Sequence, residues 1–193
     1  MLEHFPIDAA DFDGPVLVTG AGGCIGSWTI ALLVRAGASV AVLDLAEDRR
    51  RPGLLMSGDA LAKVRWFTGD IAETKSVMLA AEASEARAII HLAALQVPFC
   101  KADPVAGARV NVVGTVNVFE AARKHGIQRL AYASSVAALG AIEAGAMATL
   151  YGAYKHCDEQ VARVYRQERG LCSGRGGRRA PAEDRARGEH RGL

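Results

Sequence analysis

The stretch PVLVTGAGGCIG, residues 15–26, decides the expected fold. Its apolar first half predicts a buried strand that ends at a glycine. Gly20, Gly23 and Gly26 follow at GxxGxxG spacing and lead into an amphipathic pattern, residues 25–37, which predicts a helix. Glycine permits positive φ and lets backbone N–H groups approach a phosphate at the start of a helix. A tight turn between strand and helix also needs glycine, so the string by itself leaves both interpretations open.

Further along the chain, apolar strand patterns alternate with helical patterns. Strands are predicted at residues 39–45, 64–71, 87–94 and 128–135, and helices at residues 73–85, 104–126 and 150–170. Asp103 is placed to cap the helix that begins at Pro104. Apolar strands that are each followed by a helix predict a parallel sheet covered on both faces. The expected fold class is therefore α/β, with a doubly wound parallel sheet.

Charge is distributed unevenly along the 193 residues, whose formal net charge is +2. Residues 172–193 hold six Arg and three acidic residues, which leaves 17 basic and 18 acidic residues, a net charge of −1, for the rest. Because the rest of the chain has no basic field, a nucleic-acid partner is not expected.

The sequence also bears on where the protein is located. It contains no run of about 18 apolar residues, so no membrane span is predicted. The acidic N-terminus has no apolar signal segment, so we expect a cytoplasmic protein. The four cysteines show neither CxxC nor metal-like spacing and are expected to be free thiols.

Asp44 ends the second predicted strand, 18 residues after Gly26. In a unit of strand, glycine-rich turn, helix and strand, a carboxylate here would hold the ribose hydroxyls of a dinucleotide. The alternative is an aspartate that faces solvent at a strand end. Because a carboxylate repels a 2′-phosphate, Asp44 favours NAD over NADP. Arg49, Arg50 and Arg51 would attract such a phosphate, but they are expected to lie on a solvated loop.

The stretch YGAYKHCDE, residues 151–159, places two tyrosines ahead of one lysine. Helix positions four apart share a face, so Tyr151 lies beside Lys155, whereas Tyr154 points about 100° away and is expected to pack. A neighbouring ammonium and a positively charged nicotinamide would both favour the phenolate form of Tyr151. Tyr151 is therefore the candidate acid–base group for hydride transfer at an alcohol. Any amphipathic helix can show YxxxK by chance, so this interpretation depends on the elements that precede it.

Taken together and in order, several motifs make the chain resemble the extended short-chain dehydrogenase/reductase family, the NAD-dependent epimerase/dehydratases. They are TGAGGCIG, an Asp ending the second strand, GDI, HLAA, NVVGT, YASS and YGAYK, and they cover roughly residues 14–171. The resemblance implies a Rossmann-like NAD-binding domain with a smaller C-terminal substrate domain. It also implies hydride transfer at a secondary alcohol of a sugar or sugar-like small molecule. Related enzymes often dimerise through a four-helix bundle, so the resemblance implies a homodimer.

Carried over by position, the family's residues form a cofactor set and a catalytic set. The cofactor set comprises Gly20, Gly23, Cys24, Ile25 and Gly26 for the pyrophosphate, Asp44 for the ribose, Asp70 and Ile71 for the adenine, Leu92, Ala93 and Ala94 for the middle of the cofactor, and Asn111, Tyr151 and Lys155 for the nicotinamide half. The catalytic set comprises Ser135, Tyr151 and Lys155, with Ser135 bonding the substrate oxygen. Gln96 and Pro98 are candidate substrate contacts.

Some of these residues also have a purely structural interpretation. Asp70 would cap a turn, and Asn111 would bond neighbouring backbone. His91 is expected to pack at a strand end rather than act as a ligand. Successive side chains of a strand alternate between its faces, so only one of Ser134 and Ser135 can face the site, and family position selects Ser135.

The chain departs from the family pattern in two places. Ser135 and Tyr151 are only 16 residues apart, and the short apolar insert between them predicts a smaller substrate lip than in sugar-nucleotide epimerases. After residue 171 the composition changes to Arg, Gly and Ala, which predicts a disordered tail. The expected domains are an N-terminal extension, residues 1–13, an NAD-binding domain, residues 14–171, and the tail, residues 172–193.

The abrupt change of composition suggests a chain truncated at its C-terminal side, lacking most of the substrate domain. We hypothesise a frameshift or gene-model error, and downstream DNA that encodes no apolar strand in another frame would refute it. The alternative to an active enzyme is then an inactive remnant, or a dinucleotide-binding module without catalysis. Sensors of this fold commonly lose the Tyr–Lys pair, whose presence argues for the enzyme. The motifs do not decide the substrate, or between epimerase, dehydratase and dehydrogenase.

Overall fold

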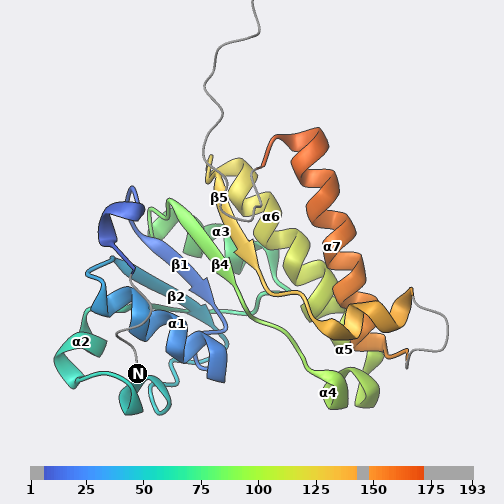
Figure 1. The fold of residues 1–193 in the computed structure, drawn as a ribbon, viewed down its shortest axis with the longest axis horizontal. Coiled ribbons are helices and arrows are strands. Elements are labelled where there is room, and N and C mark those ends of the chain that lie inside the picture. Colours follow the sequence, from blue (N-terminus) through green and yellow to red (C-terminus); the bar gives the residue numbers. More distant parts are fainter. Residues whose placement is uncertain (1–6, 143–147, 172–193) are drawn as a thin grey trace, which may run out of the picture.

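Figure 1 shows the fold in a computed structural model, which describes residues 7–142 and 148–171. Five parallel strands form one sheet in the order β3-β2-β1-β4-β5. They are β1 (Val16–Thr19), β2 (Val40–Asp44), β3 (Arg65–Thr68), β4 (Ala88–His91) and β5 (Arg129–Tyr132). Helices separate the strands along the chain and lie against both faces of the sheet. The predicted α/β class with a Rossmann-like parallel sheet is confirmed.

The helices differ in length and type. The longer ones are α1 (Cys24–Arg35), α3 (Thr74–Ala83), α6 (Gly114–Lys124) and α7 (Leu150–Arg169), and the shorter ones are α2 (Gly58–Ala62), α4 (Val97–Ala102) and α5 (Pro104–Ala108). Short 3-10 segments are η2 (Ala9–Asp11), η3 (Pro52–Leu54) and η5 (Val136–Ala141), and a π-helical segment, η4 (Arg109–Val113), joins α5 to α6.

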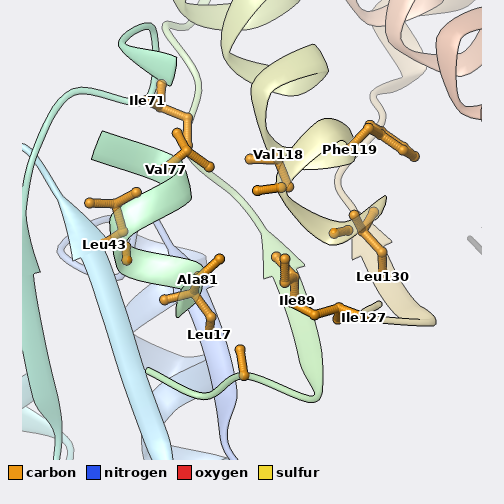
Figure 2. Packing of buried hydrophobic residues seen from close by; sticks show 14 of the residues in the cluster. Leu17, Leu43, Ile71, Val77, Ala81, Ile89, Val118, Phe119, Ile127 and Leu130 are labelled. Atoms are coloured by element: carbon orange, nitrogen blue, oxygen red, sulfur yellow. The ribbon is translucent and has the colours of Figure 1, made fainter. Parts of the chain in front are cut away.

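Side chains that alternate along the strands build two apolar cores, one on each face of the sheet. On one face, Leu17 and Ile89 pack with side chains of α3, α6 and α7, among them Phe119 (Figure 2). On the other face, Val18 packs with Ile30 of α1. Because both faces are covered at the centre of the sheet, β1, β2 and β4 are largely buried and apolar along their length, as expected for a parallel sheet. The two cores hold the carboxyl ends of the strands in fixed positions, and the functional motifs follow those ends.

The predicted elements agree with the observed ones, and the differences lie where local patterns are short. The four predicted helices begin and end within two residues of α1, of α3, of the continuous α5–η4–α6 stretch and of α7. Asp103 caps α5 by accepting from the Ala106 N–H at 2.9 Å, as expected. Helices α2 and α4 were not predicted, because five or six residues are too few to show a helical period. The π-helical character of η4 was not predicted either.

The strand order reverses at β1. From β1 the chain moves outward through β2 to β3, and then returns to the other side of β1 to form β4 and β5. At such a reversal the connections leave the two central strands in opposite directions, and a crevice opens at their carboxyl ends. The glycine-rich turn follows β1 and the HLAA motif ends β4, so the fold brings both to this crevice.

The described part of the N-terminal extension contacts the start of β5. The Arg129 guanidinium donates to the carbonyl of Asp11 and lies 5.5 Å from the ring centroid of Phe12. The predicted tail, residues 172–193, lies outside the described residues. Among residues 7–142 and 148–171, no helix is long and apolar enough to span a membrane.

Candidate active site

A pocket of about 530 Å³ opens at the carboxyl ends of the central strands. It is lined by the glycine-rich turn after β1, the end of β2, the loop after β4 and one face of α7. The sequence-predicted residues that line it are Gly20, Gly23, Cys24, Ile25, Gly26, Asp44, Asp70, Ile71, Leu92, Ala93, Ala94, Tyr151 and Lys155. Residues far apart in the sequence therefore meet in one concave site. Three predicted residues, Pro98, Asn111 and Ser135, are not among those that line it.

The turn after β1 brings backbone segments into close contact. Gly20 has a φ of +75°, and a Cβ atom at Gly26 would lie only 2.2 Å from the carbonyl oxygen of Gly20. Glycine at position 26 thus lets α1 begin directly against the turn. The helix has Gly23 as its N-cap, with no side-chain cap bond. Its first backbone N–H groups are then available to an anion such as a pyrophosphate, so this turn fits a dinucleotide.

Asp44 is held against the glycine-rich turn. Its Oδ2 accepts from the Gly22 N–H at 2.9 Å, and its Oδ1 accepts from the Leu45 N–H at 2.8 Å. The side chain is half-buried and lines the pocket, so it is not the solvent-facing aspartate of the alternative interpretation. Each carboxylate oxygen can accept more than one hydrogen bond. Asp44 can therefore still accept hydroxyl groups from a ligand.

The three arginines after Asp44 are exposed, as expected. Arg49 pairs with Glu47, and Arg50 pairs with Asp48 at 2.7 Å. Only Arg51 lines the pocket. Two of the three cations near Asp44 are therefore already paired with acids, and the local charge does not become strongly positive.

Helix α7 presents Tyr151 and Lys155 to the pocket on one face. Tyr151 is half-buried, whereas Lys155 is only 4 % exposed. The Lys155 ammonium donates to the carbonyl oxygen of Ala133 at 2.9 Å. Tyr154 is not among the pocket-lining residues, and its hydroxyl donates to the carbonyl of Pro104 at 2.9 Å, which confirms its predicted packing role. Tyr151 and the buried ammonium of Lys155 therefore line the same pocket from one face of α7.

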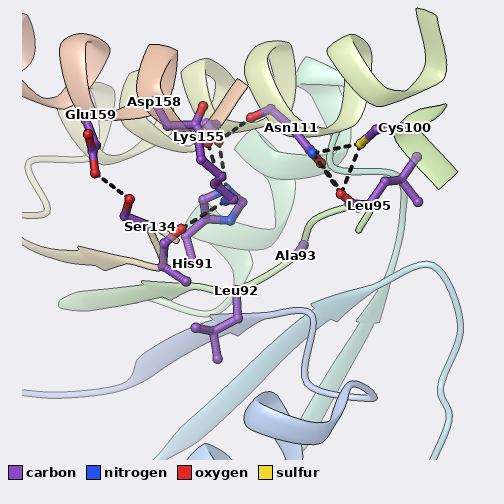
Figure 3. A network of polar contacts seen from close by, with 12 residues as sticks. His91, Leu92, Ala93, Leu95, Cys100, Asn111, Ser134, Lys155, Asp158 and Glu159 are labelled. Carbon is purple, nitrogen blue, oxygen red and sulfur yellow. Dashed lines mark hydrogen bonds and ion pairs between the residues drawn. The ribbon is translucent and has the colours of Figure 1, made fainter. Parts of the chain in front are cut away.

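Asn111 supports the pocket from behind. It is buried in η4, and its side chain clamps Leu95, accepting from the Leu95 N–H at 2.7 Å and donating to the Leu95 carbonyl at 2.8 Å (Figure 3). Leu95 itself lines the pocket. The structure thus gives Asn111 the backbone-bonding role that was the alternative interpretation. Direct contact of Asn111 with a cofactor stays a prediction.

His91 lies buried at the end of β4, between two threonines. Its Nδ1 is 2.7 Å from the Thr19 hydroxyl, and its Nε2 is 3.1 Å from the Thr115 hydroxyl. Because Thr115 donates its proton to the carbonyl of Asn111, its oxygen accepts from Nε2–H, which assigns the neutral tautomer. Burial, and then the charge of Lys155, lower the pKa of His91 to about 3. His91 is therefore a neutral link between β1 and α6, and its placement at a strand end agrees with the expectation.

The two serines after β5 have different surroundings. Ser134 lines the pocket, and its hydroxyl donates to Oε1 of Glu159. The Ser135 hydroxyl accepts from the Ala137 N–H at 3.2 Å and caps η5. Only Ser134 therefore faces the pocket as the structure describes it. The substrate-orienting role of Ser135 stays a prediction.

The remaining pocket residues were not predicted to hold the cofactor or to take part in catalysis. They are Gly22, Leu43, Leu45, Ala46, Asp48, Arg51, Gly69, Leu95, Val110, Ala133 and Ser134, together with Gln96, which was expected only as a substrate contact. Gly22 could have been found, because it lies inside the glycine-rich turn. Val110 and Ala133 could not, because nothing local distinguishes them from core residues.

The described cysteines are free thiols, as predicted. They are Cys24, Cys100 and Cys157, whereas Cys172 lies outside the described residues. Burial raises the thiol pKa of both Cys100 and Cys157.

Comparisons with known proteins find UDP-glucose 4-epimerases among both the curated relatives and the solved structures. UDP-glucose 4-epimerase of Bos taurus is 34% identical over 134 residues, which cover 65% of this chain and 38% of the bovine protein. The UDP-glucose 4-epimerase of Mycolicibacterium smegmatis is 38% identical over 120 residues, which cover 62% of this chain and 38% of that protein. Among solved structures, the NAD complex of the UDP-glucose 4-epimerase from Thermus thermophilus has a TM-score of 0.69 at 33% identity, and the match covers 81% of this chain and 52% of that one.

The chain spans about half the length, or less, of the relatives it matches. The model of the NAD dependent epimerase/dehydratase family nevertheless matches most of this chain, residues 16–177. The matched region includes every element of the sheet, the glycine-rich turn and the helix that carries Tyr151 and Lys155. On this evidence the chain belongs to the NAD-dependent epimerase/dehydratase family.

Proposed function

We propose that this chain binds NAD in the pocket, and that Tyr151 and Lys155 serve hydride transfer at a secondary alcohol of a sugar or sugar-like substrate. One observation carries the proposal: a single pocket brings together the glycine-rich turn, Asp44 and the Tyr151–Lys155 pair. When bound, NAD would supply an acceptor for the hydride.

The pocket offers a place for each part of the dinucleotide. The turn from Gly20 to Gly26 and the start of α1 would hold the pyrophosphate, and Asp44 would accept the ribose hydroxyls. Asp70 and Ile71 would lie at the adenine. The negative charge of Asp44, with Arg49 and Arg50 already paired, supports NAD rather than NADP.

Tyr151 would act as the acid–base group. In oxidation its phenolate would take the hydroxyl proton of the substrate, and in reduction its phenol would return that proton. The Lys155 ammonium supports this role, since a positive charge beside the ring favours the phenolate. Ser135 would bond the substrate oxygen, as the family position suggests.

The names of the relatives support a sugar substrate. The bovine and mycobacterial relatives are UDP-glucose 4-epimerases, so a nucleoside diphosphate sugar is the first candidate. The short apolar insert after Ser135 argues for a smaller substrate lip than such enzymes usually have. Dimerisation, implied by the family resemblance, remains part of the proposal.

Calorimetric titration of the chain with NAD and NADP tests the cofactor. We expect NAD to bind and NADP to bind at least about tenfold more weakly, because one charge–charge repulsion at short range is worth roughly 1.4 kcal/mol or more. A folded chain that binds neither would overturn the proposal.

Turnover on a panel of UDP-sugars and sugar alcohols tests the chemistry, with sugar products separated by chromatography and NADH followed by absorbance. Tyr151→Phe should lose any turnover, because it removes the hydroxyl that would exchange the substrate proton. A parent that binds NAD and turns over nothing would favour the non-catalytic module or inactive remnant instead.

A further inference from the structure

Asp158 is a buried carboxylate next to Lys155 that the proposed chemistry does not use. It lies three residues after Lys155 on α7 and is 0 % exposed. Its Oδ2 is 3.4 Å from the Lys155 ammonium nitrogen (Figure 3). Both members of the pair are buried, which distinguishes it from five other ion pairs of the described residues, whose side chains are at least 30 % exposed.

A buried ion pair is costly to form, so its geometry is informative. Removing two charges from water costs several kcal/mol per ion unless good contacts compensate, and removal of one partner leaves the other uncompensated. The Lys155 ammonium has three N–H donors, of which one bonds Ala133 and one faces Asp158. The third is left for a group in the pocket, which Lys155 lines.

The other oxygen of Asp158 is buried and lacks a hydrogen bond of good geometry, although buried carboxylate oxygens are nearly always bonded. The Thr115 hydroxyl lies close enough to influence the Asp158 carboxyl. That hydroxyl, however, gives its proton to the carbonyl of Asn111 and accepts from His91. Oδ1 of Asp158 is therefore a buried carboxylate oxygen to which the described residues offer no hydrogen bond of good geometry.

Charged and titratable groups surround Asp158 on several elements. On α7 they are Lys155, Cys157 and Glu159, on β4 His91, on β5 Tyr132 and on α4 Cys100, which responds to Lys155. Arg166 of α7 acts on Tyr132, His91 is neutral, and Lys155 is the cation that acts on Asp158 itself. The Lys155 ammonium thus has one buried counter-ion, and that counter-ion is Asp158.

We propose that Asp158 is a positioning residue for the acid–base pair: its buried carboxylate holds the Lys155 ammonium beneath the pocket and sets how much of the ammonium's charge reaches Tyr151. The effect of Asp158 on Tyr151 rests on the proposed function, whereas its pairing with Lys155 does not. When Asp158 is ionised the pair is neutral overall. When Asp158 takes up a proton, the positive charge of Lys155 faces Tyr151 without compensation.

Asp158 changes between its ionised and protonated states near pH 6, where the protein can be studied in solution. Burial raises the pKa of Asp158 to about 6, and Lys155, Thr115 and Glu159 modify it by smaller amounts. Above this pH Asp158 is ionised and the pair is complete. Below it the carboxyl is protonated and Lys155 loses its counter-ion.

Carbon-13 NMR of the lysine side chains tests the pairing directly. The sequence has five lysines, and the Lys155 Cε signal is the one absent from Lys155→Met. In the parent we expect this signal to shift with an inflection near pH 6, coincident with the titration of the Asp158 carboxyl carbon. In Asp158→Asn, which removes the charge and keeps the shape, the inflection should be lost. Glu168→Gln, an exposed carboxylate on the same helix, should keep it.

Two results would overturn the proposal. One is a folded parent whose Lys155 signal shows no inflection where the Asp158 carboxyl titrates. The other is an inflection that persists in Asp158→Asn, since it would then report another group. If Asp158→Asn does not fold, the parent decides alone, because the two carbon signals must share a midpoint.

Calorimetry with NAD on the same samples separates this inference from the proposed function. A parent that shows the Lys155 inflection but binds no NAD contradicts the proposed function and supports the pairing. A parent that binds NAD but shows no inflection supports the function and contradicts the role of Asp158.

Discussion

At the residue scale, His91 and Asp158 show how burial sets charge near the pocket. Both are buried and both lie close to Lys155, yet their pKa values move in opposite directions. Burial lowers the pKa of His91 and raises that of Asp158, because in each case the charged form is disfavoured. As a consequence, the His91 ring is neutral at neutral pH, whereas the pKa of the Asp158 carboxyl is about 6.

The two residues contribute to stability with opposite signs as pH changes. The folded pKa of His91 is depressed, so its contribution is present above about pH 6.5 and is lost as pH falls toward 3. The folded pKa of Asp158 is raised, so its contribution is present below about pH 4 and is lost as pH rises through 6. The larger displacement belongs to His91, and we expect the chain to lose stability in acid.

His91→Gln should reduce this acid sensitivity. The amide keeps a polar side chain between the threonines but takes up no proton. Between pH 7 and pH 5 the parent should lose about 2 kcal/mol more free energy of unfolding than the variant, because the unfolded histidine gains a proton that the folded one refuses. Urea unfolding at both pH values measures the difference. Equal losses in parent and variant would show that His91 is not the source.

Asp44→Asn tests the carboxylate at the end of β2. It removes the charge that would bond the ribose while leaving one oxygen for the backbone N–H groups of Gly22 and Leu45. We expect NAD affinity to fall about 10- to 100-fold, as for hydrogen bonds to a charged group. Calorimetry measures it, with Asp59→Asn on α2 as an exposed control that should bind as the parent does. A variant with parental affinity would contradict the role of Asp44.

At the element scale, glycine positions determine how closely helices approach the pocket. A Cβ at Gly152 would lie 2.2 Å from the carbonyl oxygen of Ala137, so glycine lets the first turn of α7 pack on η5. That contact positions Tyr151, one residue earlier. The π-helical segment η4 also shapes the pocket. It places Asn111 where its side chain can bond Leu95 in the loop after β4.

Gly26→Ala should destabilise the chain and weaken NAD binding together. The added methyl would meet the backbone of Gly20 and Ala21, which cannot move aside as a side chain could. We expect a loss of roughly 1–3 kcal/mol in the free energy of unfolding. Gly58→Ala on α2 is the matched control, because nothing lies within 4 Å of its Cβ. Chemical unfolding compares them, and a Gly26→Ala variant as stable as Gly58→Ala would contradict the close approach.

At the scale of the whole molecule, β5 is one of the two outer strands of the sheet in the described chain, and β3 is the other. Ala131 of β5 is exposed, and so are several large apolar side chains of the helices and loops around α7, among them Val136, Leu139 and Leu150. An edge strand presents unpaired backbone groups that can pair with another chain. The described chain therefore combines the candidate cofactor pocket with an edge at β5 that no described strand pairs.

We expect concentration-dependent self-association at this edge. Ala131→Lys should reduce it, because a charged side chain on an edge strand disfavours strand pairing. Sedimentation velocity over a range of concentrations measures the association, with Ala62→Lys on α2 as an exposed control. A parent that stays monomeric, or a variant that associates as strongly as the parent, would contradict the prediction.

The sequence by itself determined the features that depend on residues a few positions apart, within a turn of helix or a short stretch of strand. Apolar periodicity located the strands and longer helices, the spacing of Gly20, Gly23 and Gly26 located the turn, and the four-residue spacing selected Tyr151 over Tyr154. Each depends on neighbours a few residues away, so each can be read from a short stretch.

Only the tertiary structure decided which side chains lose contact with water and what they meet there. It placed Ser134 on the pocket and Ser135 at a cap, turned Asn111 toward Leu95, and buried Asp158 against Lys155. The three-residue spacing of that pair is visible in the sequence, but its burial is not. Burial depends on α4, η4, α6 and η5 packing against α7, and these contacts join residues that no local pattern connects.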